Sequence, residues 1–293
     1  MNRMPFMHYK KDKNDLVKSY FIALIPLLLF GIYKNGILLY VNDLININKI
    51  FIPLYFYMIS AVVALLISLI MKEDIKYNIL LCLVIASSVS INTNMLIYPI
   101  LLFVSLFIAK YVCNKFKFNV ISFSRLLLIL SLLINSYSYL NIAEKLDKFN
   151  YGLFDIFLGH GVGGIATTSA LILIISLIII SFNKYYKKII PIVSSVTFLL
   201  FGLLYVFLTK NYEYIKLILN GNVYFSFIFV AADLYITPYN KKGMCIYALI
   251  IGVLASLFSI IFNIYEAGYI SILLVSIFIP FINKIVNKEY FKI

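Results

Sequence analysis

The sequence predicts an all-α, polytopic membrane protein. Of its 293 residues, 63% are hydrophobic and only 13% are charged, a composition too apolar for a soluble domain. The apolar residues gather in runs that are separated by short polar or basic turns. Backbone polar groups have no water partners in lipid, so we expect these runs to be transmembrane helices.

We expect about ten such helices in a single integral membrane domain that covers residues 1–293. The hydrocarbon layer is about 30 Å thick and takes roughly 20 helical residues to cross, and several of the runs are shorter. The first run follows a basic N-terminal segment without a small-residue cleavage site, which indicates a retained span rather than a signal peptide. The runs are about Val17–Tyr33, Phe51–Met71, Asn78–Ser90, Met95–Cys113, Ser122–Leu140, Thr168–Phe182, Ile189–Thr209, Asn222–Tyr235, Met244–Asn263 and Tyr269–Val286.

The basic residues orient these runs. With both termini in the cytoplasm, most lysines and both arginines fall in inside loops, as the positive-inside rule requires of a plasma or inner membrane protein. The same placement explains the formal net charge of +13 without a nucleic-acid partner. The basic residues left in outside loops are Lys34, Lys49, Lys145, Lys148, Lys210 and Lys216.

The ten runs divide into two weakly similar halves, repeat 1 at about 17–140 and repeat 2 at about 155–286. Phe51-Ile52-Pro53 opens the second run, and Ile189-Ile190-Pro191 opens the seventh. An odd number of spans in each half makes the second half insert in the opposite orientation, so we expect two inverted five-helix repeats.

The third and eighth runs are too short to cross the membrane, and both break off in polar residues. Paired short or broken helices in an internal repeat point to a buried ligand site. The eighth run ends at Asp233, followed by Thr237, and a carboxylate at membrane depth is costly and usually functional. Two alternatives remain: both runs are re-entrant spans without a ligand, or Asp233 pairs with Lys241 or Lys242.

A glycine-rich segment, residues 159–169, leads into the sixth run. Glycine lets backbone amides approach an anion, and hydroxyls at a helix N-terminus favour negative charge. We therefore expect a phosphate-bearing cofactor here, although the segment is neither a Walker loop nor a dinucleotide fingerprint. The alternative is a turn with threonine caps. The candidate cofactor-binding residues are Gly159, Gly163, Gly164, Thr167, Thr168, Ser169, Asp233 and Thr237.

Catalytic and metal chemistry have little support. The chain has no nucleophile–base pair at catalytic spacing and no HExxH motif, so we expect no catalytic residues. Its two histidines exclude a histidine-rich metal site. Cys82, Cys113 and Cys245 form no CxxC pair, and buried thiols are the simpler interpretation than a shared metal.

These residues, taken in order, resemble the RnfD/NqrB family. The run from Phe225 to Pro238, followed by Gly243 and Gly252, is similar to the family's eighth span, with Ala232 and Leu234 where the family has Thr and Pro. The segment from Phe157 to Leu171 is similar to the family's glycine-rich entry to span six, with Thr167 in place of Glu. Weaker matches in the same order are Ala23–Pro26 with Gly31, Phe118-Asn119, Tyr265-Glu266, and Pro280–Asn283, with Ser276 and Asn283 departing from the family's Asn and Asp.

The resemblance implies a ten-helix membrane subunit of an Rnf complex or a sodium-pumping NADH:quinone oxidoreductase. Such a subunit carries flavin for electron transfer coupled to ion movement, beside other membrane subunits in the lipid bilayer. The family attaches FMN to a threonine in the loop between spans five and six, but this chain has no threonine between Thr93 and Thr167. We therefore expect FMN or riboflavin to bind non-covalently, if at all, with no threonyl-FMN. The alternatives are a solute or flavin transporter with the same fold, and a scaffold that has lost both roles.

Overall fold

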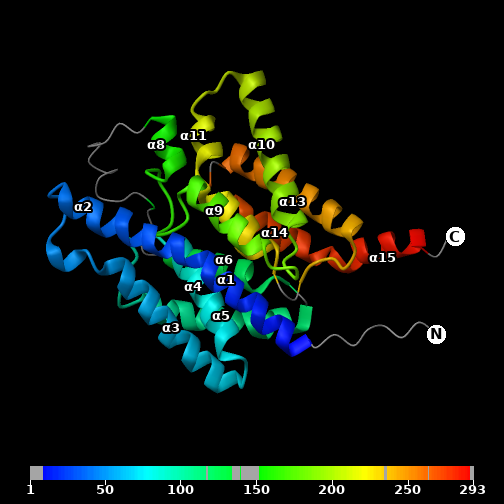
Figure 1. Ribbon diagram of the computed structural model, residues 1–293, viewed down its shortest axis with the longest axis horizontal. Coiled ribbons are helices and arrows are strands. Elements are labelled where there is room, and N and C mark those ends of the chain that lie inside the picture. Colours follow the sequence, from blue (N-terminus) through cyan, green and yellow to red (C-terminus); the bar gives the residue numbers. More distant parts are fainter. Residues whose placement is uncertain are drawn as a thin grey trace.

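The computed structural model describes residues 9–116, 118–133, 139, 152–233, 236–262 and 264–290, and the regular structure in these residues is entirely helical (Figure 1). The first half contains α1 (Tyr9–Ile32), the π-helical turn η1 (Tyr33–Ile37), α2 (Leu38–Val41), the short 3₁₀ turn η2 (Ile47–Lys49), α3 (Ile52–Met71), α4 (Ile75–Ser88), α5 (Tyr98–Phe116) and α6 (Val120–Leu133). The second half contains α8 (Leu153–Leu158), α9 (Ala170–Ser181), α10 (Ile189–Thr209), α11 (Tyr214–Leu219), α12 (Gly221–Ser226), the π-helical turn η3 (Phe227–Ala231), α13 (Lys241–Phe262), α14 (Ala267–Ile277) and α15 (Ile279–Tyr290).

The chain is a multi-pass membrane protein. In the described residues, five helical stretches are long and apolar enough to cross a membrane, and a sixth is reached if the bent pair α14–α15 counts as one span. The helices α4, α5, α6 and α9 are apolar but shorter. Each predicted run coincides with a helix or a pair of helices, whereas ten complete crossings and the inverted repeat stay predictions.

Two helices in corresponding places of the two halves begin and end alike. Proline is the second residue of α3 and the third of α10, where its missing N–H costs no helical hydrogen bond. Both helices end at a lysine in the left-handed conformation, Lys72 with φ 52° and Lys210 with φ 57°. A non-glycine residue pays about 1 kcal/mol or more for this conformation, so the shared ending supports the predicted similarity of the halves.

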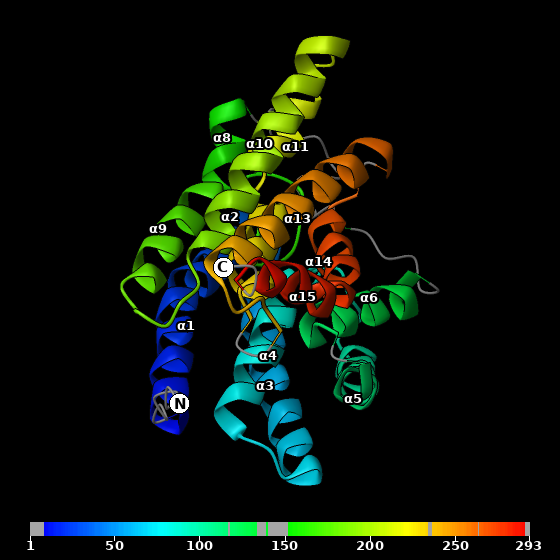
Figure 2. The ribbon, with the colours of Figure 1, turned by 90° about the vertical axis from the view of Figure 1, so that its right-hand side faces the viewer.

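The packing also joins helices at corresponding places of the two predicted halves. The helices of the first and sixth predicted runs pack together, α1 against α9, and so do those of the fifth and tenth runs, α6 against α14. Figures 1 and 2 show α10 and α13 side by side at one end of the molecule and α3 at the other, with α1 and α9 between them. This arrangement places α4 and α12–η3 in the interior.

Two predicted spans, the first and the tenth, differ in detail from the structure. The first helix continues through η1 to Val41 without leaving the helical path. The tenth run is two helices that meet at 55°, because Pro280 lacks the N–H needed to continue the helix across Phe278. The predicted end of the fifth run at Leu140, and with it the end of repeat 1, lies outside the described residues.

Candidate functional site

The two short runs form half-helices that lie antiparallel in the core. Near the start of α4, the Tyr77 hydroxyl donates to Asp233 Oδ1 at 3.1 Å, just after η3 ends. At the other end, residues 159–169, here named the glycine strap, bridge the end of α4 and the start of α12. The Ile165 amide donates to Val89 O at 2.9 Å, and the Gly164 amide to Asn222 Oδ1 at 3.3 Å.

Close backbone packing fixes the glycine strap against α4. A Cβ on Gly164 would lie 2.6–2.8 Å from the backbone of Ser88, closer than any side chain tolerates. Besides the Ile165 bond, the Ala166 amide donates to Ser87 O at 2.9 Å. Gly159, with φ 116°, ends α8 in a conformation open mainly to glycine. The strap therefore caps the C-terminal carbonyls of α4 at residues that are buried in the protein.

The hydroxyls of the strap also have partners inside the protein. Thr167 donates to Asn222 Oδ1, Thr168 donates to Gly159 O at 2.7 Å, and Ser169 caps α9 by accepting from the Ile172 amide. Lys34, in η1, is 3% exposed and donates to Gly161 O and to Thr168 Oγ1. The amides predicted to meet a phosphate at Gly164 are thus engaged by the protein itself.

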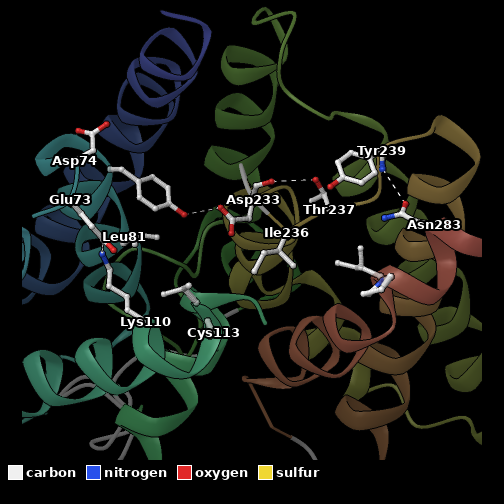
Figure 3. Close-up of a pocket in the computed structure, with 14 residues that line it drawn as sticks. Glu73, Asp74, Leu81, Lys110, Cys113, Asp233, Ile236, Thr237, Tyr239 and Asn283 are labelled. Carbon is white, nitrogen blue, oxygen red and sulfur yellow. Dashed lines mark hydrogen bonds and ion pairs between the residues drawn. The ribbon is translucent and has the colours of Figure 1, made fainter. Parts of the chain in front are cut away.

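Asp233 lines a cavity of about 730 Å³ at the other end of α12–η3 (Figure 3). Figure 3 shows Asp233 between Glu73 and Lys110 on one side and Thr237 and Asn283 on the other. The cavity is lined by three carboxylates, one lysine, and other polar and apolar side chains. The complete lining is Glu73, Asp74, Tyr77, Leu81, Lys110, Cys113, Val120, Asp233, Ile236, Thr237, Tyr239, Ile279, Pro280 and Asn283. Asp233 is only 4% exposed.

The end of η3 is held by side chains from helices distant in the sequence. Tyr186 donates to Ile228 O at 2.9 Å, Asn119 to Val230 O at 3.0 Å, and Tyr20 to Ala232 O at 2.7 Å. A π-helical turn leaves carbonyls out of the regular ladder, and such turns are frequent at functional sites. These three neutral donors satisfy the carbonyls and set the position of Asp233.

Two lysines frame the Asp233 cavity. Lys110 is 4% exposed, forms an ion pair with Glu73 and donates to Asn78 Oδ1. Lys187, in the turn between α9 and α10, donates to Thr237 Oγ1. Burial lowers the pKa of Lys187, and the charge of Asp233 opposes this by raising it. Asp233 therefore acts electrostatically on Lys187.

A second cavity, of about 860 Å³, lies beside the glycine strap at the Asn220 end of α12. The rings of Tyr205 and Tyr214 meet edge to face, with centroids 5.2 Å apart. Burial and the charge of Lys34 lower the pKa of His160, while Asp155 raises it, with a net fall from 6.5. The cavity lining includes Gly152, Ile156, His160, Gly161, Val162, Tyr205, Asn211, Glu213, Tyr214, Lys216, Leu217, Asn220, Ser259, Ile260 and Tyr265.

The structure separates the predicted site residues into two groups. The strap residues lie at one end of α12–η3, and Asp233 and Thr237 lie at the other, roughly 15 Å away at the helical rise per residue. Neither cavity contains both groups. Among the described residues, no three His, Cys, Asp or Glu side chains gather as a metal site.

The sequence interpretation missed several buried polar residues. Lys34 and Lys110 were assigned to loops by charge counting, and both are inside the helix bundle. Arg125 was counted among the basic residues of the inside loops, and it is 0% exposed. Glu266 accepts a hydrogen bond from Tyr139, a contact that the sequence interpretation did not include. The sequence contained one signal for the burial of Arg125. The residue lies inside the predicted fifth run, which begins at Ser122, and not in the loop before it, and in the structure it lies within α6.

The fold and site define a polytopic membrane protein with two antiparallel half-helices and a buried carboxylate between them. Its sequence matches the NQR2, RnfD, RnfE family over residues 1–292, so the chain belongs to that family. It is thus a membrane subunit of the kind found in multi-subunit Rnf- and Nqr-type complexes. A comparison with curated proteins finds no match.

Proposed function

We propose that the chain is a membrane subunit of a flavin-dependent, ion-translocating electron-transfer complex, with both termini in the cytoplasm. The observation that carries this proposal is the pair of half-helices, because each end of α12–η3 meets its own cavity. One cavity has the chemistry of an ion site and the other the chemistry of a flavin site. In the predicted orientation they open toward opposite faces of the membrane.

The Asp233 cavity suits a proton or a monovalent cation. The C-terminal end of a helix carries a partial negative charge, and Asp233 adds a carboxylate at that point. The Tyr77 hydroxyl and the Thr237 hydroxyl supply further oxygens beside it. Broken helices of transporters present unwound carbonyls and helix C-termini to coupling ions in this way.

The cavity beside the glycine strap suits a non-covalent flavin. Its volume lies within the roughly 300–1,000 Å³ typical of ligand pockets. Tyr205, Tyr214 and Tyr265 would face the ring system, and Lys216 or His160 would meet a phosphate. A bound flavin would supply one- and two-electron transfer there. This places the cofactor next to the strap rather than on the Gly164 amide, which donates to Asn222 Oδ1.

Two measurements on the purified chain test the proposal. Flavin that co-purifies and is released by SDS supports the cofactor site, and Tyr214→Ala should lower its occupancy, with Tyr212→Ala on the exposed surface as the control. The unfolding temperature should depend on pH or on sodium concentration in the wild type and lose that dependence in Asp233→Asn. A sodium response at constant pH identifies a cation, and a pH response alone identifies a proton.

The competing function is a solute transporter with the same fold, and it is favoured by the missing threonine between Thr93 and Thr167. A transporter should take up its solute in liposomes without partner subunits, and Asp233→Asn should abolish this uptake. A redox subunit should show no uptake alone, and Asp233→Asn should reduce electron flow in the assembled complex.

A further inference from the structure

The two half-helices end on opposite charges. At the end of α4, the Nη2 atom of Arg125 donates to Ser88 O at 2.7 Å. Arg125 belongs to α6 and is 0% exposed, so its guanidinium is fully inside the helix bundle. At the end of η3, the donors to the carbonyls are neutral, and the nearest charged group is the Asp233 carboxylate.

Tyr139, and through it a carboxylate of the second half, hold the Arg125 guanidinium in place. The same Nη2 atom donates to the Tyr139 hydroxyl at 2.6 Å, and Tyr139 in turn donates to Glu266 Oε1. Glu266 is the residue that precedes α14, which packs against α6. A carboxylate of the second half thus reaches, through one tyrosine, the cation at the end of the first half-helix.

The energetic reason for a buried cation at this point is the helix terminus. The last carbonyls of a helix carry about half a negative charge, so a cation at that point is favourable. Arginine remains charged under all ordinary conditions, so this cation never leaves. A buried charge is costly, and the helix terminus together with Tyr139 and Glu266 offsets this cost for Arg125.

We propose that Arg125 is a built-in cation that occupies the α4 terminus, so that each chain keeps one exchangeable cation or proton site, at Asp233, instead of two. In repeat 1 the side chain fills the position that a mobile ion takes in repeat 2. This inference rests on the proposed ion site at Asp233 for its functional meaning. The structural part of the inference, that the covalently attached charge of Arg125 occupies the position beside Ser88 O, is tested separately.

The test uses the full-length chain in detergent and measures the unfolding temperature against guanidinium and sodium at constant ionic strength. Arg125→Gln removes the charge and keeps a donor, whereas Arg125→Lys keeps the charge. We expect Arg125→Gln to gain a saturable rise in unfolding temperature with guanidinium, roughly 5 °C at 100 times its Kd. Arg125→Lys and Glu266→Gln, which both retain a cation, should show no such gain.

The gain should persist in the double variant Arg125→Gln/Asp233→Asn, because the new site is at the other half-helix. A folded Arg125→Gln protein whose unfolding temperature responds to neither guanidinium nor sodium overturns the proposal, whatever its stability relative to Arg125→Lys. If Arg125→Gln does not fold, recovery of monodisperse protein on solubilisation with guanidinium supports the proposal, and no recovery at any concentration that the wild type tolerates overturns it. Failure of the proposed ion site at Asp233 gives a different result. The unfolding temperature of the wild type would then not depend on pH or sodium through Asp233, whereas the guanidinium response of Arg125→Gln would remain.

Discussion

Gly164→Ala is expected to destabilise the protein by forcing the glycine strap away from α4. The new Cβ would lie 2.6–2.8 Å from the Ser88 backbone, and backbone atoms do not rotate away as a side chain does. Overpacking of this kind costs about 1–3 kcal/mol. A shift of the strap also stretches the bonds from Ile165 to Val89 and from Ala166 to Ser87, each contributing about 1 kcal/mol. We therefore expect a loss of about 2–4 kcal/mol.

The free cysteines provide the assay. Cys82 and Cys113 are buried, so a thiol-reactive fluorescent dye reports unfolding in detergent as they become accessible. The chain has no tryptophan, which removes the usual intrinsic probe. At about 2–4 °C per kcal/mol for a protein of this size, the expected fall in unfolding temperature is roughly 4–15 °C.

Gly161→Ala is the matched control within the same segment. Its Cβ would meet the nitrogen of the Asn220 side-chain amide at 3.2 Å, a contact that a shift of a few tenths of an ångström relieves. The control should therefore lose much less stability than Gly164→Ala. Equal unfolding temperatures for Gly164→Ala and the wild type would refute the reasoning, because they would mean that the strap is not packed on the α4 terminus.

Three further changes test the environment of the two cavities by the same assay. Lys110→Met should cost about 1–3 kcal/mol, because Asn78 Oδ1 loses its donor in the core, and a wild-type unfolding temperature would contradict this. Tyr186→Phe should cost about 1 kcal/mol by freeing Ile228 O, while Tyr185→Phe, whose ring lies beside Lys184, should be neutral. His160 has a pKa below 6.5 when folded, so protonation opposes folding, and stability should fall as pH drops below about 6.5; His160→Gln should flatten this fall, and an unchanged slope would exclude His160 as its cause.

The apolar runs were predictable from the sequence because burial in lipid leaves a direct mark on composition. Each run coincides with helical structure, and the short third and eighth runs are the half-helices α4 and α12–η3. Their endings in Ser87-Ser88 and at Asp233 also indicated that they stop inside the protein. Hydropathy and residue type are local properties, and these features depend on little else.

The partners of the buried polar groups were not predictable in the same way. Tyr77 meets Asp233 across 156 positions of sequence, and Lys34 meets Gly161 across 127. A lysine near a helix end has the same local sequence whether it lies in water or turns inward. The positive-inside count therefore assigned Lys34 and Lys110 to loops, although packing places both in the interior.

The glycine strap shows how one pattern serves two structures. Glycines followed by hydroxyl residues fit a phosphate loop, and they equally fit a segment whose backbone must touch a helix end. The choice depends on what faces the amides, and here Ser87, Val89 and Asn222 face them. That information lies in residues more than 50 positions away, so the pattern alone supported the phosphate interpretation.

The visible absorption and fluorescence of the gently purified protein, recorded before and after denaturation in SDS, test the central claim most directly. The account predicts flavin that stays with the folded chain and is released by SDS, since no threonine is available between Thr93 and Thr167. Flavin retained on the denatured chain would contradict non-covalent binding. No flavin in any preparation, including one made with partner subunits, would contradict the redox function itself.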